Sequence, residues 1–174
     1  MLATIRLGAT IALSSAAFTA ALPTRAQVQN SGYLVPAQLA IEAASESVRA
    51  CEANGYRVTA AVVDTAGELR VLIKGDHSTT HTRETALRKA YTVATLGPIF
   101  GTDALSALTE KMKNNPYQAS FLTIPNIILL PGAVALRAKG EIVGAVGVGG
   151  APGGEKDEAC AVAGAAKIRD RLPQ

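Results

Sequence analysis

Short turns join neighbouring strand candidates in this chain, and this pattern constrains the fold more than any other feature. Residues 56–64 are rich in apolar and β-branched side chains, residues 68–74 alternate, and only Thr65-Ala66-Gly67 separates the two segments. Strands joined by so short a turn pair as an antiparallel hairpin, because a parallel connection needs a crossover of a dozen or more residues. The sheet is therefore expected to be antiparallel.

Three further strand candidates follow in the second half of the chain. Pro131-Gly132 and Lys139-Gly140 separate them, and both pairs contain residue types that favour turns. The candidates span Asn126–Leu130, Val134–Ala138 and Glu141–Gly149. Together with the first hairpin, they predict a five-stranded antiparallel sheet.

Segments with helical periodicity surround these strands. The expected helices span residues 36–54, His81–Leu96, Thr102–Lys113 and Glu155–Arg171, with Gly97-Pro98 ending the second. The element order is αββ–αα–βββ–α, without an internal repeat, and the helices must cover the sheet. We therefore predict a single domain over residues 36–172 with an α/β fold of the α+β kind, an α/β/α sandwich that resembles the profilin-like folds.

The first 26 residues have the features of a cleavable secretory signal. A segment containing Arg6 precedes the apolar run Leu7–Leu22, which is followed by Pro23 and the small-residue pattern ending at Ala26. The apolar run is shorter than the roughly 20 residues that span a bilayer. We expect cleavage after Ala26, no stable membrane anchor afterwards, a periplasmic or extracellular location, and a flexible segment over residues 27–35.

The charge balance of the chain argues against a nucleic-acid partner. The formal net charge is +3 for the whole sequence, and the signal segment contains two of the 17 basic residues and none of the 14 acidic ones. The mature chain is thus close to neutral. It has no basic block interleaved with aromatic residues, which is the pattern typical of nucleic-acid binding.

Cys51 and Cys160 are the two cysteines of the chain. An even number of cysteines in an oxidising compartment favours a disulfide, which here requires the first and last helices to be neighbours. The alternative is that each cysteine is a small buried apolar residue on its own helix.

The segment Asp76–Glu84 contains both histidines, His77 and His81, four residues apart where a loop meets a helix. No third histidine or cysteine lies nearby, so a zinc site is not expected, but one exposed histidine can be an axial ligand to haem iron. Arg83 and Lys89 are candidates to pair with an anionic group such as a propionate. The alternatives are capping and turn roles for the segment and solvated helix-face charges for the two cations.

The glycine-rich run from Gly144 to Gly154 precedes a helix whose first turns are acidic. Pro152 occupies the third glycine position of a dinucleotide fingerprint, and nearby carboxylates repel phosphate, so tight packing and turn geometry explain the glycines better. Glu155 and Glu158 are candidate ligands of a surface cation, since hard metal ions prefer oxygen ligands. The alternative is the ordinary preference for acidic residues at a helix start.

Several segments together resemble the haem-binding HbpS-like family, which includes the GlcG protein of glycolate-utilisation operons and the C-terminal domain of certain corrinoid adenosyltransferases. The resembling segments are Val58–Asp64 with Gly67, Ala86–Ala90 with Ala94, Leu130–Ala133, Gly140–Ala151, and Asp157–Ala161 with Ala163 and Gly164. One departure is Ala133, where many relatives have a second glycine. The resemblance implies the predicted element order, assembly into homo-oligomers, and binding of haem or a related tetrapyrrole, with His77 and His81 as candidate ligands of the iron.

The resemblance therefore leads to the hypothesis of an exported haem-binding protein that takes part in haem capture, haem degradation or redox sensing. A second hypothesis is an enzyme or accessory protein acting on a small hydroxy acid, which a signal peptide disfavours because that metabolism is cytosolic. A third is an exported oligomer without a cofactor. The absence of tryptophan slightly favours the third hypothesis, because haem pockets often stack aromatic rings on the porphyrin.

Overall fold

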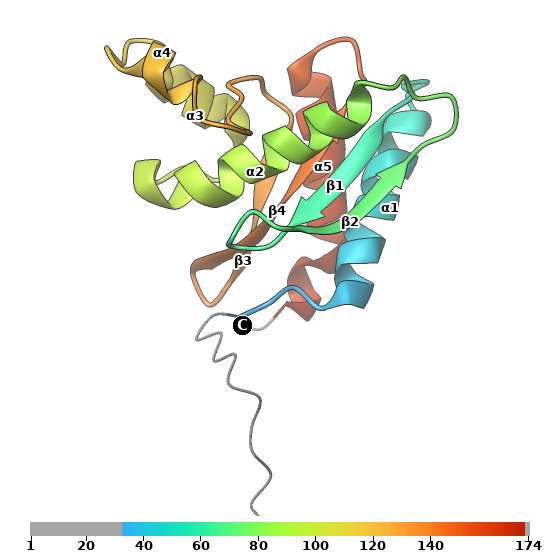
Figure 1. The fold of residues 1–174 in the computed structure, drawn as a ribbon. Helices are drawn as coiled ribbons and strands as arrows, with labels where there is room; N and C mark the ends of the chain where they lie inside the picture. Colours follow the sequence, from blue (N-terminus) through green and yellow to red (C-terminus); the bar gives the residue numbers. More distant parts are fainter. Residues whose placement is uncertain (1–32, 173–174) are drawn as a thin grey trace, which may run out of the picture. The chain divides into compact units, whose positions relative to one another are not determined.

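The computed structural model describes residues 33–172, so the predicted signal peptide and residues 27–32 lie outside the described part of the chain. Its helices and strands follow one another in groups (Figure 1). The elements are α1 (Ala37–Glu52), β1 (Thr59–Val63), β2 (Leu69–Lys74), α2 (Thr82–Phe100), α3 (Leu105–Met112), α4 (Gln118–Phe121), β3 (Ala133–Ala138), β4 (Glu141–Gly149), α5 (Gly154–Ile168) and the 3-10 helix η1 (Arg169–Arg171).

The four described strands form one antiparallel sheet in the order β2-β1-β4-β3. The predicted mixed α+β fold with an antiparallel sheet is therefore confirmed. All five residues of β1 are buried, and β4 is buried from its third residue onward. Such continuous apolar strands are typical of a sheet whose two faces are both covered.

Helices lie on both faces of the sheet (Figure 1). Val62 packs in a cluster with residues of α1 and α5, whereas its neighbour Val63 packs in a second cluster with residues of α2 and α3. Successive side chains of a strand point to opposite faces. Consequently the described residues have two apolar clusters separated by the sheet. Val35, which the sequence prediction includes in the flexible segment, is buried in the α1/α5 cluster.

The prediction of a fifth strand at Asn126–Leu130 is wrong, because the described sheet has four strands and this segment is irregular. Side chains of α2 satisfy its backbone instead. Arg88 donates to the carbonyl of Ile127 (2.8 Å), and the N–H of Ile128 donates to the hydroxyl of Thr92 (2.9 Å). Apolar residues between prolines look like a strand in sequence, but these groups are paired with a helix.

Helix α2 also departs from expectation, because it continues through Gly97-Pro98 to Phe100. A proline removes one backbone donor from a helix, and here the loss falls in the last turn, where it interrupts little. Gly101 then ends the helix with a left-handed φ of 61° and donates its N–H to the carbonyl of Gly97. The helix α4 was not predicted.

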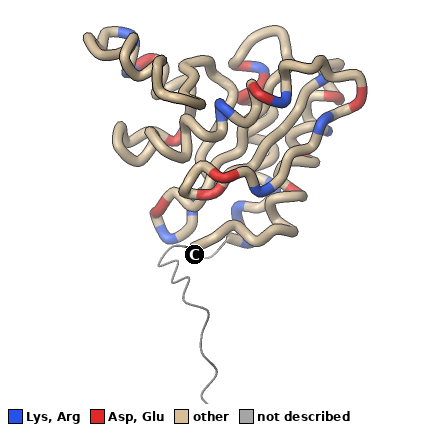
Figure 2. Tube along the Cα trace, viewed as in Figure 1, with Lys and Arg blue, Asp and Glu red and all other residues tan. Residues whose placement is uncertain are grey.

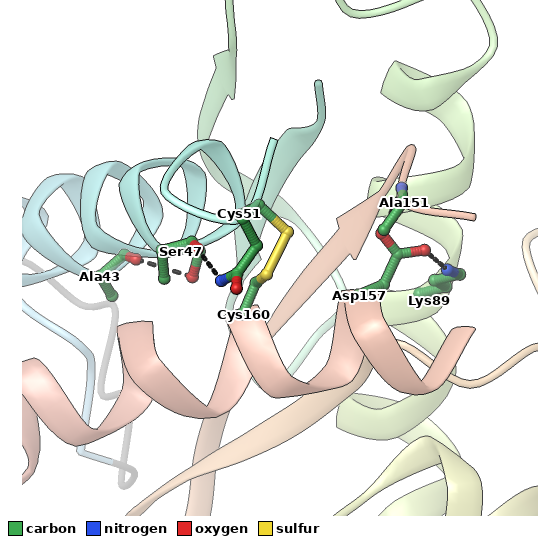
Figure 3. The surroundings of a disulfide bond; sticks show 9 residues. Ala43, Ser47, Cys51, Lys89, Ala151, Asp157 and Cys160 are labelled. Atoms are coloured by element: carbon green, nitrogen blue, oxygen red, sulfur yellow. Dashed lines mark hydrogen bonds and ion pairs between the residues drawn. A yellow bond between two sulfur atoms is a disulfide. The ribbon is translucent and has the colours of Figure 1, made fainter. Parts of the chain in front are cut away.

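Helices α1 and α5 pack unusually closely on one face of the sheet (Figure 3). A Cβ atom on Gly164 would lie 2.0 Å from the hydroxyl oxygen of Ser47 and 2.4 Å from the carbonyl oxygen of Ala43. Only glycine allows this approach. A disulfide joins Cys51 of α1 to Cys160 of α5, with their Cα atoms 5.5 Å apart.

Charged residues of both signs are interspersed along the described chain (Figure 2). One long exception is the segment of residues 114–136, which contains no charged residue. Within residues 33–172, no helix combines the length and the hydropathy needed to cross a membrane.

Candidate functional site

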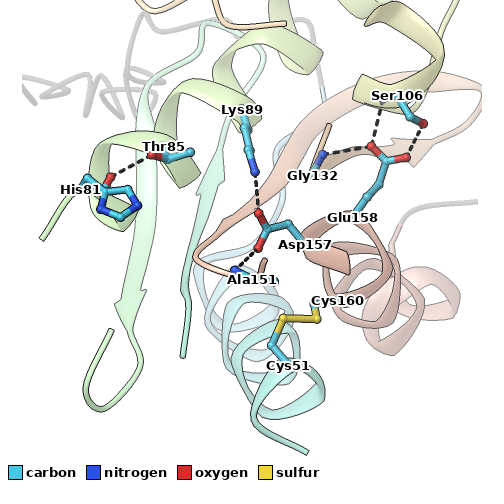
Figure 4. Close-up of polar contacts among 10 residues, drawn as sticks. All are labelled: Cys51, His81, Thr85, Lys89, Ser106, Gly132, Ala151, Asp157, Glu158 and Cys160. Carbon is cyan, nitrogen blue, oxygen red and sulfur yellow. Dashed lines mark hydrogen bonds and ion pairs between the residues drawn. A yellow bond between two sulfur atoms is a disulfide. The ribbon is translucent and has the colours of Figure 1, made fainter. Parts of the chain in front are cut away.

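A buried ion pair joins the helical layers on the two faces of the sheet, at the end of the sheet where the loop after β4 meets the loop before β3. Lys89 of α2 and Asp157 of α5 are 1% and 3% exposed, and the Lys89 Nζ lies 2.7 Å from the Asp157 Oδ2 (Figure 4). Removing one partner of such a pair leaves an uncompensated charge in the interior, at a cost of about 3–5 kcal/mol. A substitution of only one of the two residues is therefore expected to destabilise the folded protein strongly.

The other oxygen of Asp157 holds the loop that follows β4. Asp157 Oδ1 accepts a hydrogen bond from the N–H of Ala151 (2.9 Å). Burial raises the pKa of the Asp157 carboxyl above its ordinary value, and the ammonium of Lys89 partly offsets this effect. Both carboxylate oxygens are thus occupied by donors of the protein itself.

Glu158, the next residue, makes a parallel set of contacts on the side of α3. Its carboxylate accepts the N–H of Gly132 (3.1 Å), the N–H of Ser106 (3.0 Å) and the hydroxyl of Ser106 (Figure 4). Glu158 therefore ties the start of α3 and the turn before β3 to α5.

Gly132 packs directly against the ion pair. Its φ is 132°, and a Cβ atom there would lie 2.6 Å from the Lys89 Nζ and 2.8 Å from the Asp157 Cβ. The close approach therefore requires glycine. We call Lys89, Ser106, Gly132, Ala151, Asp157 and Glu158 the Lys89 centre. Four of the segments that resemble the HbpS-like family contribute to it or border it.

The chemistry open to the Lys89 centre follows from its burial. The ammonium is held by a carboxylate 2.7 Å away, and the turn at Gly132 covers it, so a ligand reaches it only if that turn moves. As it stands, the centre positions the loops before β3 and after β4. Within residues 33–172, no three His, Cys, Asp or Glu side chains are grouped closely enough to hold a metal ion.

The two histidines lie apart from this centre. His77 is exposed in the loop between β2 and α2, where its φ is 62°, and His81 is exposed at the N-cap of α2. The Nδ1 of His81 lies 3.2 Å from the hydroxyl of Thr79. His81 and Lys89 are separated by about 12 Å of helix rise. The role of either histidine as an iron ligand stays a prediction.

The other predicted site residues are either exposed or part of the Lys89 centre. Arg83 is exposed on the first turn of α2, near His81 in sequence. Lys89 lies inside the protein and pairs with Asp157, and its suggested pairing with a propionate stays a prediction. Glu158 accepts hydrogen bonds from N–H and O–H groups, and Glu155 is exposed. Their role as ligands of a surface cation stays a prediction.

Sequence reasoning missed the pairing of Lys89 with Asp157, although the sequence contains a signal for it. On α2, Lys89 falls three residues after buried Ala86 and four before buried Val93, which places it on the buried stripe. Asp157 occupies the same kind of position on α5, four residues before Ala161. A lysine and an aspartate on buried helix faces usually need a charged partner.

The family model described as "Haem degrading protein HbpS-like" matches residues 35–166 of this chain. Among solved structures, a double mutant of HbpS from Streptomyces reticuli is 32% identical, with 84% of this chain and 95% of that chain covered and a TM-score of 0.72. No curated protein matches the chain at a significant level.

Two more distant structures share the fold. Protein ORFY from Klebsiella pneumoniae, of the DUF336 family model, is 19% identical over 86% of this chain and 97% of that chain, with a TM-score of 0.70. PduOC, solved as a haem complex, is 19% identical over 78% of this chain and 95% of that chain, with a TM-score of 0.68.

These matches define a class of small α+β domains with the fold described above. The chain belongs to the HbpS-like family, because the family model covers most of its length.

Proposed function

We propose that this chain is an exported haem-binding protein that acts in haem capture, haem degradation or redox sensing. The observation that carries the proposal is the match to the haem degrading HbpS-like family over residues 35–166. The 32% identity to HbpS over nearly all of that chain supports it. Homo-oligomeric assembly is part of the proposal.

Two features support export. The N-terminal 26 residues have the order of a secretory signal, with cleavage after Ala26. The disulfide between Cys51 and Cys160 suits an oxidising compartment, because cytosolic thiols are normally kept reduced. The mature protein therefore works in the periplasm or outside the cell.

The donor chemistry of the histidine segment fits a haem. His77 and His81 are both exposed, and one imidazole is enough for a proximal iron ligand. Arg83 is an exposed cation two residues after His81 and is the candidate partner of a propionate. When bound, haem would supply the redox and oxygen chemistry, whereas these residues would hold the iron and one carboxylate.

The test is a titration of the mature protein, residues 27–174, with hemin while the Soret band is recorded. We expect a saturable shift that is lost or altered in the double variant His77→Ala/His81→Ala. The matched control is Asp76→Ala/Thr80→Ala, which changes two exposed residues of the same loop. No saturable shift would overturn haem binding. A shift that both double variants retain unchanged would overturn the histidine assignment alone.

A further inference from the structure

Exposed apolar side chains gather around α4, at the opposite end of α2 from the two histidines. Ile99, in the last turn of α2, is 73% exposed, and Tyr117, at the N-cap of α4, is 68% exposed. Leu122 and Ile124, which follow α4 in the sequence, are 47% and 44% exposed. We call these four residues the α4 surface.

An aromatic contact holds α4 beside the end of α2. The rings of Phe100 and Phe121 meet edge to face, with their centroids 5.7 Å apart. Both side chains are half-buried and pack against the apolar cluster of α2 and α3. Figure 1 shows α3 and α4 at one end of the molecule, next to the C-terminal end of α2. The sequence neighbours Ile99 and Leu122 therefore belong to the same region of the surface.

Helix α4 buries very little within its own chain. It has only four residues, Gln118–Phe121, and none of them is buried. The backbone hydrogen bonds around it are local, such as the one from the N–H of Ile124 to the carbonyl of Phe121 (3.1 Å). A helix this short is marginal in water and depends on packing against other parts of a protein. Covering the α4 surface would therefore stabilise this part of the fold.

The distribution of charge indicates what kind of surface can cover it. Residues 114–136 form the longest run of the sequence without a charged residue, and Ile99 lies in another uncharged run, residues 90–102. The two cations that precede the longer run have partners, because Lys111 donates to the carbonyl of Phe100 (2.6 Å) and Lys113 pairs with Glu110 (3.2 Å). The α4 surface thus has no charge with which to attract a charged partner, and its complement is another uncharged apolar surface.

A second copy of the chain supplies such a surface. Permanent interfaces between identical chains are more apolar than other interfaces, and charged residues are depleted at their centres. In a two-fold contact the same patch of both copies meets itself. Apolar side chains then face apolar side chains, and no charge loses its water.

We propose that the α4 surface is an interface between two copies of this chain. The inference rests on the homo-oligomeric assembly included in the proposed function, and it names the surface that forms the assembly. The two copies meet around a two-fold axis, and each covers Tyr117, Leu122 and Ile124 of the other.

The experiment measures the mass of the mature protein, residues 27–174, by light scattering over a range of concentrations. We expect the wild type to form an assembly of two or more chains. Tyr117→Asp should give smaller assemblies and raise the dissociation constant by about a hundredfold or more, because two-fold symmetry buries the new carboxylate twice. Ile124→Asp should have the same effect, and it is the second variant if circular dichroism shows that Tyr117→Asp does not fold.

The matched control is Ile41→Asp, which changes a residue of α1 that is 43% exposed and lies outside the α4 surface. It should keep the wild-type mass. An assembly that both α4-surface variants leave unchanged would refute this interface while homo-oligomeric assembly stands. A wild type that is monomeric at every concentration would refute both. The same holds if that monomer floats with phosphatidylcholine vesicles and Tyr117→Asp does not, since the surface would then bind lipid.

Haem binding is tested separately on the same samples. A smaller assembly of Tyr117→Asp supports the interface whether or not hemin shifts the Soret band. Absence of that shift in the wild type and in all variants would overturn haem binding alone. The failure of the interface and the failure of the proposed function are thus distinguishable.

Discussion

The two halves of α5 differ in how much of the protein surrounds them. In the N-terminal half, Asp157, Glu158 and Cys160 are tied respectively to α2, to α3 with the turn before β3, and to α1. In the C-terminal half, Val162 and Ala165 line a groove beside the edge strand β3. The N-terminal half is thus held by buried polar contacts and the disulfide, whereas the C-terminal half packs on α1 through Gly164 on one side and is exposed on the other.

The contrast is sharpest at the ion pair, so the largest effect is expected there. Asp157→Ala leaves the ammonium of Lys89 buried without a partner and should lower the free energy of unfolding by about 3–5 kcal/mol. Urea unfolding followed by circular dichroism measures it. The control is Asp170→Ala, an exposed aspartate beyond α5, which should change stability by less than about 0.5 kcal/mol.

A double variant distinguishes a lost partner from lost packing. Lys89→Met/Asp157→Leu removes both charges and fills the space with apolar atoms, so it should be clearly more stable than Asp157→Ala alone. Equal stability of Asp157→Ala and wild type would mean that the N-terminal half of α5 is not anchored by this pair.

The disulfide is the second anchor of the same half, and its removal should have a somewhat smaller effect. Cys51→Ala/Cys160→Ala releases a cross-link between residues 109 positions apart and should lower the free energy of unfolding by about 2–4 kcal/mol. Thermal unfolding of the oxidised protein and the variant measures the difference. Two alkylated cysteines in mature protein denatured without reductant would show that the bridge is not formed.

The smallest effect is a pH dependence that comes from Asp157. Because burial raises its folded-state pKa above the ordinary value of 3.8, the folded protein holds this proton at a pH where the unfolded chain has released it. Protonation of Asp157 therefore stabilises the folded state most below the unfolded-state pKa of 3.8, and this stabilisation is lost as the pH rises through the raised folded-state pKa. Carboxyl carbon NMR of the folded protein should give an Asp157 midpoint above 3.8. A midpoint below 3.8 would mean that the Lys89 ammonium outweighs burial.

Local sequence was a good guide where one residue pattern had one structural outcome. The turns at Thr65-Ala66-Gly67 and Lys139-Gly140 lie in the two hairpins of the sheet, and the first and last helices begin and end close to the expected residues. The strand prediction for Asn126–Leu130 was wrong because its apolar residues fit a strand and a buried loop equally well. The deciding groups, Arg88 and Thr92, lie more than 30 positions away.

The candidate site was less predictable than the fold for the same reason. The histidines, the arginine and the two cysteines were visible as residue types, but the role of Lys89 was not, because its partner lies 68 positions along the chain.

What the sequence determined by itself was most of the helices and strands, the antiparallel pairing of adjacent strands and the resemblance to the HbpS-like family. The helices, strands and their pairing depend on periodicity and turn residues, which act over a few positions, and the family depends on the segments that resemble it. Only the tertiary structure decided which charges are buried together and where the surface is hollow. Long-range packing brings Asp157 to Lys89 and exposes one side of the C-terminal half of α5 beside β3. Neither outcome follows from neighbouring residues in the sequence.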